Sequence, residues 1–481
     1  MGRNVARRPV LIVGSLLVLA AGCAGPAERE AHEAIADPGP NPNGAGGASA
    51  PGPHARRPAE APQSGAPPAL PEDATLQDCL DYAQQNNPGL EAALNRWKAA
   101  AERIPQARTL PDPSLNYELE AMRDSRQHMV TLNQMFPWPE KLPLRAAVAR
   151  EEAEAARQQY EAAKVSLFFR VKDAYYEYYY LGRAVAVVRE NRDLVKYLEE
   201  VARTRYKAGA AGHPDVIRAQ VELGKLDDQL RTLEDLRGAA AARVNAALNR
   251  PAEAPLAWPT SAPLEPVEAS DAEVLAWLGQ ASPELKALDH EVAREQEAVA
   301  LARKDYLPDF MVGVGYMQAW MSGEGGDDGV TVMTGITLPI WREKYAAAVR
   351  EAQDRHQAAL QTRTDRANTL GAEVKMTLYR FRDAERKIDL YRDTLLPKAR
   401  EALKATEASF RVGQAAFTDL IDAQRIFLEF QLAGERALAD HAQRRAELEM
   451  LVGRALPRAA AEPVAGPEGP QTRNENQEGE K

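Results

Sequence analysis

The feature that most constrains this chain of 481 residues is an internal duplication with a long period. The stretch YKAGAAGHPDVIRAQ, residues 206–220, is repeated as FRVGQAAFTDLIDAQ, residues 410–424. Six pairs of matching residues align without a gap, each 204 residues apart: Tyr206/Phe410, Gly209/Gly413, Asp215/Asp419, Ile217/Ile421, Ala219/Ala423 and Gln220/Gln424. A repeat of this length indicates that the chain consists of two halves built from the same parts.

Each half contains the same predicted elements in the same order. A helical stretch ends at the sequence Leu-Pro-Asp, at 110–112 and again at 307–309. A short segment with period two follows, and then a helix of roughly 65 residues, about 100 Å long. The first long helix is predicted from about Pro143 to Lys207, and the second from about Glu343 to Val412 with a kink at Pro397.

Gly209 and Gly413 stand where the long helices end, as glycine C-caps do. Asp215 and Asp419 then occupy the first turn of a returning helix, where an acid is favourable. The duplicated stretch is therefore the tip of a long antiparallel helical hairpin. The returning helix 214–249 and the later helix 283–306 together match the long helix in length, so we expect them to lie end to end beside it.

The segments with period two predict two β-hairpins, at 113–137 and 310–339. Their four strands are apolar on one face, which is typical of a membrane-spanning β-barrel. Four strands cannot close a barrel, and lipid does not tolerate open sheet edges. Two copies would supply eight strands and three would supply twelve, and only the larger barrel leaves a generous lumen. We therefore expect a trimer. The alternative is that the hairpins cover the end of a helical rod.

The predicted domains follow from these patterns and from composition. Residues 1–22 have the basic start and short apolar run of a signal peptide, too short to span a bilayer. The Pro- and Gly-rich residues 23–71 and the tail 454–481 are predicted to be disordered. The first structural repeat is 72–250, the proline-rich connector is 251–282, and the second repeat is 283–453.

The residues LAAGC, 19–23, resemble a bacterial lipobox. This resemblance implies that Cys23 is lipidated and becomes the mature N-terminus, and Ala24 after it favours the outer membrane. The alternative is ordinary cleavage after a small residue. Either way the chain is exported.

Several classes of protein are disfavoured. The net charge of −10 argues against a nucleic-acid partner, because phosphate binding needs a basic face. The seven histidines show no metal-ligand spacing, and no phosphate-binding loop or nucleophile motif is present. We therefore expect no enzyme activity, no metal site and no cofactor apart from the lipid on Cys23.

The region from about Ala74 to Val452 resembles the outer-membrane factor (TolC-like) family of efflux channels. The resemblance rests on the ordered set LPDPSL, FPWPEK, YKAGAAGHPDVIRAQ, YLPDF, LPIWREK and FRVGQAAFTDLIDAQ. It implies a mainly α fold with a small β part: long helical hairpins that form an α-barrel, and four membrane strands per chain in a trimeric 12-stranded β-barrel. FPWPEK and LPIWREK are similar to the lipoprotein, heavy-metal-efflux branch.

The resemblance also implies a function and a location. The chain would be the outer-membrane exit duct of a tripartite efflux system and conduct substrate passively. Its partners would be a periplasmic adaptor, an inner-membrane pump of the resistance-nodulation-division type, and outer-membrane lipid. It would be a lipid-anchored (palmitate) outer-membrane protein with a long periplasmic extension. The alternatives are the outer-membrane component of a type I protein secretion system, or a periplasmic helical adaptor or scaffold without a pore.

Two groups of site residues carry over from the family. The adaptor-docking positions are the helix tips Ala208, Gly209, Val412 and Gly413. The periplasmic gate is Asp419 and Asp422, of which three copies would place six carboxylates together and favour cations. For Asp419 the alternative is stabilisation of a helix N-terminus. The basic residue that locks the second tip in some members is absent, since Gln414-Ala415-Ala416 stands there.

Overall fold

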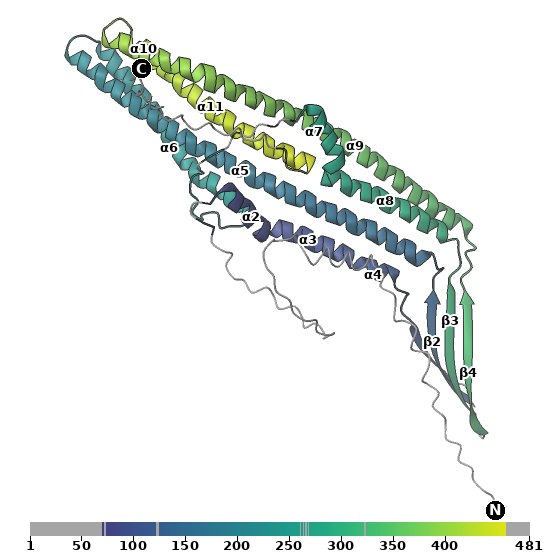
Figure 1. Cartoon of the computed structure of the whole chain (residues 1–481). Coiled ribbons are helices and arrows are strands. Elements are labelled where there is room, and N and C mark those ends of the chain that lie inside the picture. The colour runs from purple at the N-terminus through teal and green to yellow at the C-terminus, as the bar shows by residue number, and fades with distance from the viewer. Residues whose placement is uncertain are drawn as a thin grey trace, which may run out of the picture. The chain divides into compact units, whose positions relative to one another are not determined.

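The computed structural model describes residues 70–71, 74–121, 125–259, 261–262, 264, 267, 269–321 and 324–457. The predicted signal peptide and Cys23 lie outside these residues, as do nearly all of the predicted tether and tail. The fold is mainly helical with one small sheet, which confirms the predicted fold class (Figure 1).

The two halves have the same order of elements (Figure 1). The first half comprises α2 (Leu76–Asn86), α3 (Pro88–Ala101), α4 (Arg103–Arg108), β1 (Ser114–Ala121), β2 (Ser125–Phe136), α5 (Lys141–Lys207) and α6 (His213–Ala247). The second half comprises α7 (Asp271–Ala281), α8 (Pro283–Lys304), β3 (Phe310–Met321), β4 (Glu324–Ile336), α9 (Arg342–Asp389), a π-helical turn (Leu390–Leu395), α10 (Leu396–Arg411) and α11 (Phe417–Val452).

The repeat extends to α2 and α7, which the sequence did not reveal as a pair. Both helices have 11 residues and begin with a capping box, Thr75 with Asp78 in α2 and Ser270 with Glu273 in α7. In each box the hydroxyl accepts from a backbone N–H three residues later, and the carboxylate accepts from the cap N–H in return. The same local chemistry therefore starts both halves.

Between equivalent positions, the second long helix contains one residue more than the first. The buried residues of α5 and α9 correspond at an offset of 203 residues: Leu167/Leu370, Val171/Val374, Tyr178/Phe381 and Val185/Ile388. Beyond the π turn the offset is 204, as for Val195 and Ala399. A π turn closes its hydrogen bonds over five residues instead of four, so it can hold the extra residue while both ends keep their buried faces. Pro397, where we expected a kink, follows this turn at the start of α10.

The predicted end-to-end placement of 214–249 and 283–306 is wrong. At the end of α6, Asn249 Nδ2 donates to Asn86 O (3.0 Å), and Asn87 Nδ2 donates to Ala247 O (3.2 Å). At the end of α11, Gly453 lies against Pro283. Each returning helix therefore meets the first helices of its own half, α6 with α2 and α3, and α11 with α7 and α8. Helix lengths could not distinguish the two arrangements, because α3 with α4 spans about as many residues as α8.

Both junctions use a left-handed residue at equivalent positions. Asn249 has φ of 56° and Gly453 has φ of 78°, and the two are 204 residues apart. A left-handed residue turns the chain sharply after a helix, which is costly for most side chains. The repeat is therefore also visible in backbone conformation.

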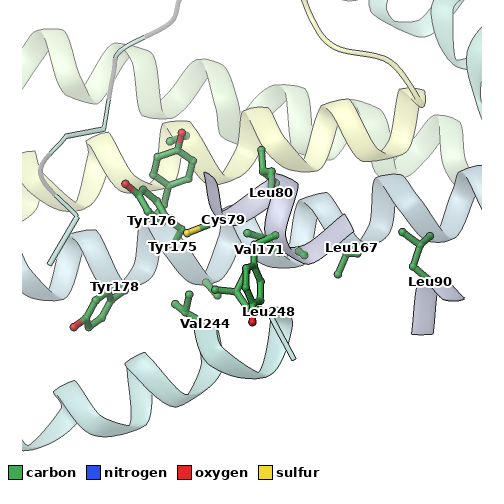
Figure 2. Close-up of a cluster of buried hydrophobic side chains, with 14 residues drawn as sticks. Cys79, Leu80, Leu90, Leu167, Val171, Tyr175, Tyr176, Tyr178, Val244 and Leu248 are labelled. Carbon is green, nitrogen blue, oxygen red and sulfur yellow. The ribbon is translucent and has the colours of Figure 1, made fainter. Parts of the chain in front are cut away.

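A hydrophobic cluster fixes each junction. Figure 2 shows the first, in which Cys79 and Leu80 of α2 lie beside Val171 of α5 and Val244 of α6. The connector joins this cluster: Trp258 stacks on Tyr178 with ring centroids 4.5 Å apart. A Cβ at Gly182 would lie 2.8 Å from Trp258, so the single glycine within α5 makes room for this ring. The described helices include none long and apolar enough to cross a membrane.

The four strands form one antiparallel sheet in the order β1-β2-β3-β4. Apolar residues stand opposite one another on one face, as in the pairs Leu115/Leu132, Val130/Tyr316 and Val314/Val332. This row is exposed, up to 69% for Leu115 and 73% for Val330. In the described structure, β1 and β4 each pair with a single strand, so both edges of the sheet are open.

Candidate functional site

The two helix tips have the same backbone geometry. Ala208 and Val412 cap α5 and α10, and the next residues, Gly209 and Gly413, have φ of 70° and 81°. After each glycine a backbone N–H returns to the helix over five residues, from Ala210 to Arg205 O and from Gln414 to Ser409 O, both 2.9 Å. These are glycine C-caps of the Schellman kind, as the sequence predicted.

The predicted docking residues are all at the surface. Ala208, Gly209 and Gly413 are exposed, and Val412 is 70% exposed although it is apolar. No described side chain lies within 4 Å of where a Cβ would stand at Gly209. A Cβ at Gly413 would lie 3.3 Å from Arg205 Nη2. Both tips thus present small and apolar groups, and Arg205 lies beside the glycine of the second.

The repeated glutamine of the tip motif holds the hairpins together. Gln220 Nε2 donates to Glu199 Oε1 (3.3 Å), and Gln424 Nε2 donates to Asn191 Oδ1 (3.2 Å). Both acceptors belong to α5, and Gln424 is fully buried. The repeat thus preserves a hydrogen bond from each returning helix to the same long helix.

Two contacts that the sequence did not predict join the first tip to the second. The guanidinium of Arg205 lies 4.6 Å above the Phe410 ring, and its Nη2 donates to Ala210 O (3.1 Å). Arg425 of α11 donates to both carboxylate oxygens of the buried Glu222 of α6, at 3.1 and 2.6 Å. These hydrogen bonds hold the pKa of Glu222 below its ordinary value, although burial opposes this. No sequence signal points to this pair, because neither residue has a counterpart at the repeat offset.

The predicted gate residues lie one turn apart at the start of α11, and each has a local partner. Asp419 Oδ2 accepts from Ala416 N (3.2 Å), so it satisfies a free N–H at the helix start. Asp422 lies 3.3 Å from Arg425 and remains 65% exposed. Arg425 is thus the local partner of Asp422. Both carboxylates are exposed at the tip.

At the other end of the helices, one lysine joins the two β-hairpins. Lys141 is only 4% exposed, and its Nζ donates to Leu307 O (3.0 Å) and Asp309 Oδ1 (2.8 Å). The same Asp309 oxygen accepts from Trp138 N (2.9 Å). Burial alone would raise the pKa of Asp309, but the hydrogen bonds from Lys141 and Trp138 outweigh it, so this pKa lies below its ordinary value. We call this set of contacts the hairpin clasp.

Within the part of the chain that the structure describes, no group of three or more His, Cys, Asp or Glu side chains is arranged to hold a metal ion. Two long helical hairpins, joined to β-hairpins with one exposed apolar face, are the parts expected of a subunit of a β-barrel membrane channel with a long helical extension. The sequence matches the family described as "Outer membrane efflux protein" over residues 79–250 and 278–454, and the chain belongs to that family.

Individual relatives agree with this assignment. The cobalt-zinc-cadmium resistance protein CzcC of Cupriavidus metallidurans is 24% identical over 401 residues, which cover 80% of this chain and 93% of that protein. The outer membrane protein TolC of Vibrio cholerae is 23% identical over 370 residues, 73% of this chain and 84% of that protein. The open state of the Neisseria gonorrhoeae MtrE outer membrane channel has a TM-score of 0.67 at 19% identity, covering 79% of this chain and 89% of that one.

The family membership confirms the main functional prediction. The protein is an outer-membrane exit channel of a tripartite efflux system, and its long helices extend into the periplasm. Members of this family are channels and not enzymes, so the protein is not an enzyme.

Proposed function

We propose that three copies of this chain close one 12-stranded barrel and one helical tunnel, through which cargo passes from an adaptor and an inner-membrane pump to the outside. The observation that carries this proposal is the four-stranded sheet with two open edges and one apolar face. Unpaired strand edges are very unfavourable in lipid, so further copies must pair with β1 and β4. Eight strands would leave an interior filled by side chains, whereas twelve leave a water-filled lumen.

The test is the mass and the conductance of the purified protein. Material extracted in mild detergent should have the mass of three chains and should form ion-conducting pores in planar lipid bilayers. A single copy without conductance would refute the channel and favour the scaffold alternative.

We propose a divalent metal cation as cargo and a pump of the resistance-nodulation-division type as partner. The support is the match to the cobalt-zinc-cadmium resistance protein, which covers 93% of that relative. Deleting the gene should raise the cellular content of zinc, cobalt or cadmium when the medium contains these ions. Unchanged metal content with impaired export of a protein would instead favour type I secretion.

We propose that Asp419 and Asp422 form the periplasmic gate, since both are exposed carboxylates at the second tip. In a trimer they would form rings that attract cations. Replacing both with Ala should lower the cation preference of the pore in bilayer recordings. Asp215→Ala is the matched control, because Asp215 occupies the equivalent first turn of the first tip. Unchanged selectivity in the double variant would refute the gate.

We propose that Ala208, Gly209, Val412 and Gly413 are the docking surface for the adaptor. Gly413→Val should abolish export, because a β-branched residue does not fit its left-handed backbone, while trimers still form. Gly238→Val is a control within α6, where no described atom lies within 4 Å of the added Cβ. Full export by Gly413→Val would argue against docking at this tip.

We propose that Cys23 carries the lipid that anchors the N-terminus in the outer membrane. Cys23→Ser should abolish labelling with radioactive palmitate, whereas Cys79→Ser should leave it intact, because Cys79 is a buried free thiol. Label that persists in Cys23→Ser would place the lipid elsewhere.

A further inference from the structure

The hairpin clasp contains one lysine and one aspartate, and the duplication gives the chain a second lysine and a second aspartate at equivalent positions. Its lysine follows β2 in the sequence WPEK, and β4 is followed by the similar WREK, which ends at Lys344. Its aspartate precedes β3 in the sequence LPD, and the same three residues precede β1, with Asp112. Lys141 and Asp309 are paired within the chain. Lys344 and Asp112 are the unused counterparts.

Both counterparts are exposed, and no side-chain hydrogen bond or ion pair joins either to the rest of the described chain. Their surroundings are equally uncovered. Trp138 of the clasp is half-buried and stacks on Phe310 at 6.0 Å, but the equivalent Trp341 is 72% exposed. Lys344 Nζ lies 5.4 Å from the ring centroid of its chain neighbour Tyr345 but pairs with no carboxylate of the described chain. One edge of the sheet thus has a lysine without a counter-ion and an exposed tryptophan, and the other edge has the matching aspartate.

The sheet places these counterparts at its two open edges. In the clasp, β2 pairs with β3, so the residue after β2 meets the residue before β3. Asp112 lies just before β1 and Lys344 follows β4, and these are the edge strands. Pairing β4 of one copy with β1 of the next, in the way that β2 pairs with β3, brings Lys344 to Asp112.

We propose that Lys344 of each copy forms a second hairpin clasp with Asp112 of the neighbouring copy, and that this clasp sets the register of the seam between copies. The proposal rests on the closed ring proposed above and identifies the contact that defines it. The partner is a second copy of this chain, because its edge carries the same residues that fill the clasp within one copy.

The register of the strands follows from a second match, because LPIWREK has one residue more between its proline and its tryptophan than FPWPEK. Within the chain Phe136 stands opposite Phe310. Matching Phe136-Pro137 to Leu338-Pro339, and the two LPD sequences to each other, sets Ile336 opposite Leu115 of the next copy. Both residues are exposed and belong to the apolar rows. A slip by one residue, which the offset between WPEK and WREK would give, would turn one of these rows to the other face of the sheet. The side-chain pattern therefore selects the match of the two proline residues for the strands.

The clasp can determine register because a buried ammonium group needs its partner. The clasp inside the chain leaves Lys141 only 4% exposed. If the seam covers Lys344 in the same way, any other register or partner would leave a buried charge without a counter-ion, which is strongly unfavourable. A neighbouring copy paired in the proposed register supplies the carboxylate of Asp112 and removes that cost.

Charge exchange tests the ion pair. Lys344→Asp and Asp112→Lys should each weaken association of the copies by more than about tenfold, because each places like charges in the seam. The double variant should recover most of the loss, which a merely structural role for either residue would not produce. The readout is the fraction of trimer against protein concentration in mild detergent. Lys141→Asp is the matched control: it should destabilise the chain itself at every concentration.

Disulfide formation tests the register. A chain with Leu115→Cys and Ile336→Cys should oxidise to covalent dimers and trimers, whereas Leu115→Cys with Gly335→Cys should not, because position 335 faces the other side. The single-cysteine variants give the background, to which the buried Cys79 should contribute little.

The outcomes separate this inference from the proposed channel. Trimers that conduct ions but show no rescue by the double charge exchange, or that cross-link through position 335, would overturn the clasp and leave the channel intact. Protein that neither associates nor conducts would overturn both.

Discussion

Gly453→Ala should be among the most damaging single-methyl additions in this protein. Gly453 ends α11 with φ of 78°, and an added Cβ would lie 2.3 Å from Pro283 Cδ, 2.9 Å from Ala281 O and 3.1 Å from Ser282 Cα. These neighbours are backbone atoms and a proline ring, so none can rotate away. The methyl group therefore meets both backbone strain and a clash at the junction of α11 with α8.

The two costs can be separated. A left-handed backbone costs an alanine about 1–2 kcal/mol. Overpacking adds about 1–3 kcal/mol when the neighbours cannot relax. Gly453→Ala should thus lower the free energy of unfolding by about 2–5 kcal/mol. Gly209→Ala is the matched control, because its φ is 70° but no described atom lies within 4 Å of the new Cβ. Gly209→Ala should lose only the part of the unfolding free energy that is due to backbone strain.

The measurement is denaturant unfolding in detergent, followed by the helical circular dichroism signal near 222 nm. The midpoint should fall further for Gly453→Ala than for Gly209→Ala, with the same dependence on denaturant. Equal losses for the two variants would show that the end of α11 is not packed against Pro283 and would contradict the junction of α11 with α8.

Four further outcomes are expected. Deleting Thr394 from the π turn should give a continuous helix and change the melting temperature little, whereas deleting Asp365 from α9 should cause a clear loss, as thermal melts would show. Lys141→Met should cost about 3 kcal/mol of unfolding free energy, since it leaves Asp309 with a single hydrogen bond from a backbone N–H. Because the pKa of Asp309 is lower in the folded than in the unfolded protein, its carboxylate stabilises the fold above the unfolded pKa, near 3.8, and this stabilisation should disappear as the pH falls through the folded pKa. Asp309→Asn should therefore flatten that part of a curve of unfolding free energy measured between pH 6 and pH 2. Burial raises the pKa of Cys79 to about 11, so maleimide should react with it only after unfolding, and rapid labelling of the native protein would contradict its place in the first junction.

Local sequence chemistry predicted much of this fold. Gly209 and Gly413 specify where the long helices end, because few other residues adopt the left-handed conformation at low cost. Strand periodicity and the apolar row likewise predicted the hairpins, and the duplication showed that both halves repeat them. These features depend on neighbouring residues in the chain, so one sequence is enough to read them.

Contacts between distant residues were not predictable in the same way. Helix lengths allowed 214–249 to meet 283–306, but the hydrogen bonds of Asn87 and Asn249 select a different neighbour. The Glu222–Arg425 pair joins residues from different halves that are not repeat equivalents. At the gate, Asp422 pairs with Arg425 one turn further along its own helix. The repeat does not reveal this pair, because the equivalent positions in the first tip are Arg218 and Val221.

The π turn at Leu390–Leu395 is the place where the two long helices can differ in length without a change in their buried faces. Substitutions can accumulate independently in each half, but adding one residue to a straight helix rotates everything after it by about 100°. The π turn confines that rotation to itself, so the second half contains one extra residue without turning buried side chains toward water. Hybrid proteins that exchange parts of the two long helices should therefore be joined with a spacing of 203 residues before this turn and 204 after it, as the buried pairs Val185/Ile388 and Val195/Ala399 require.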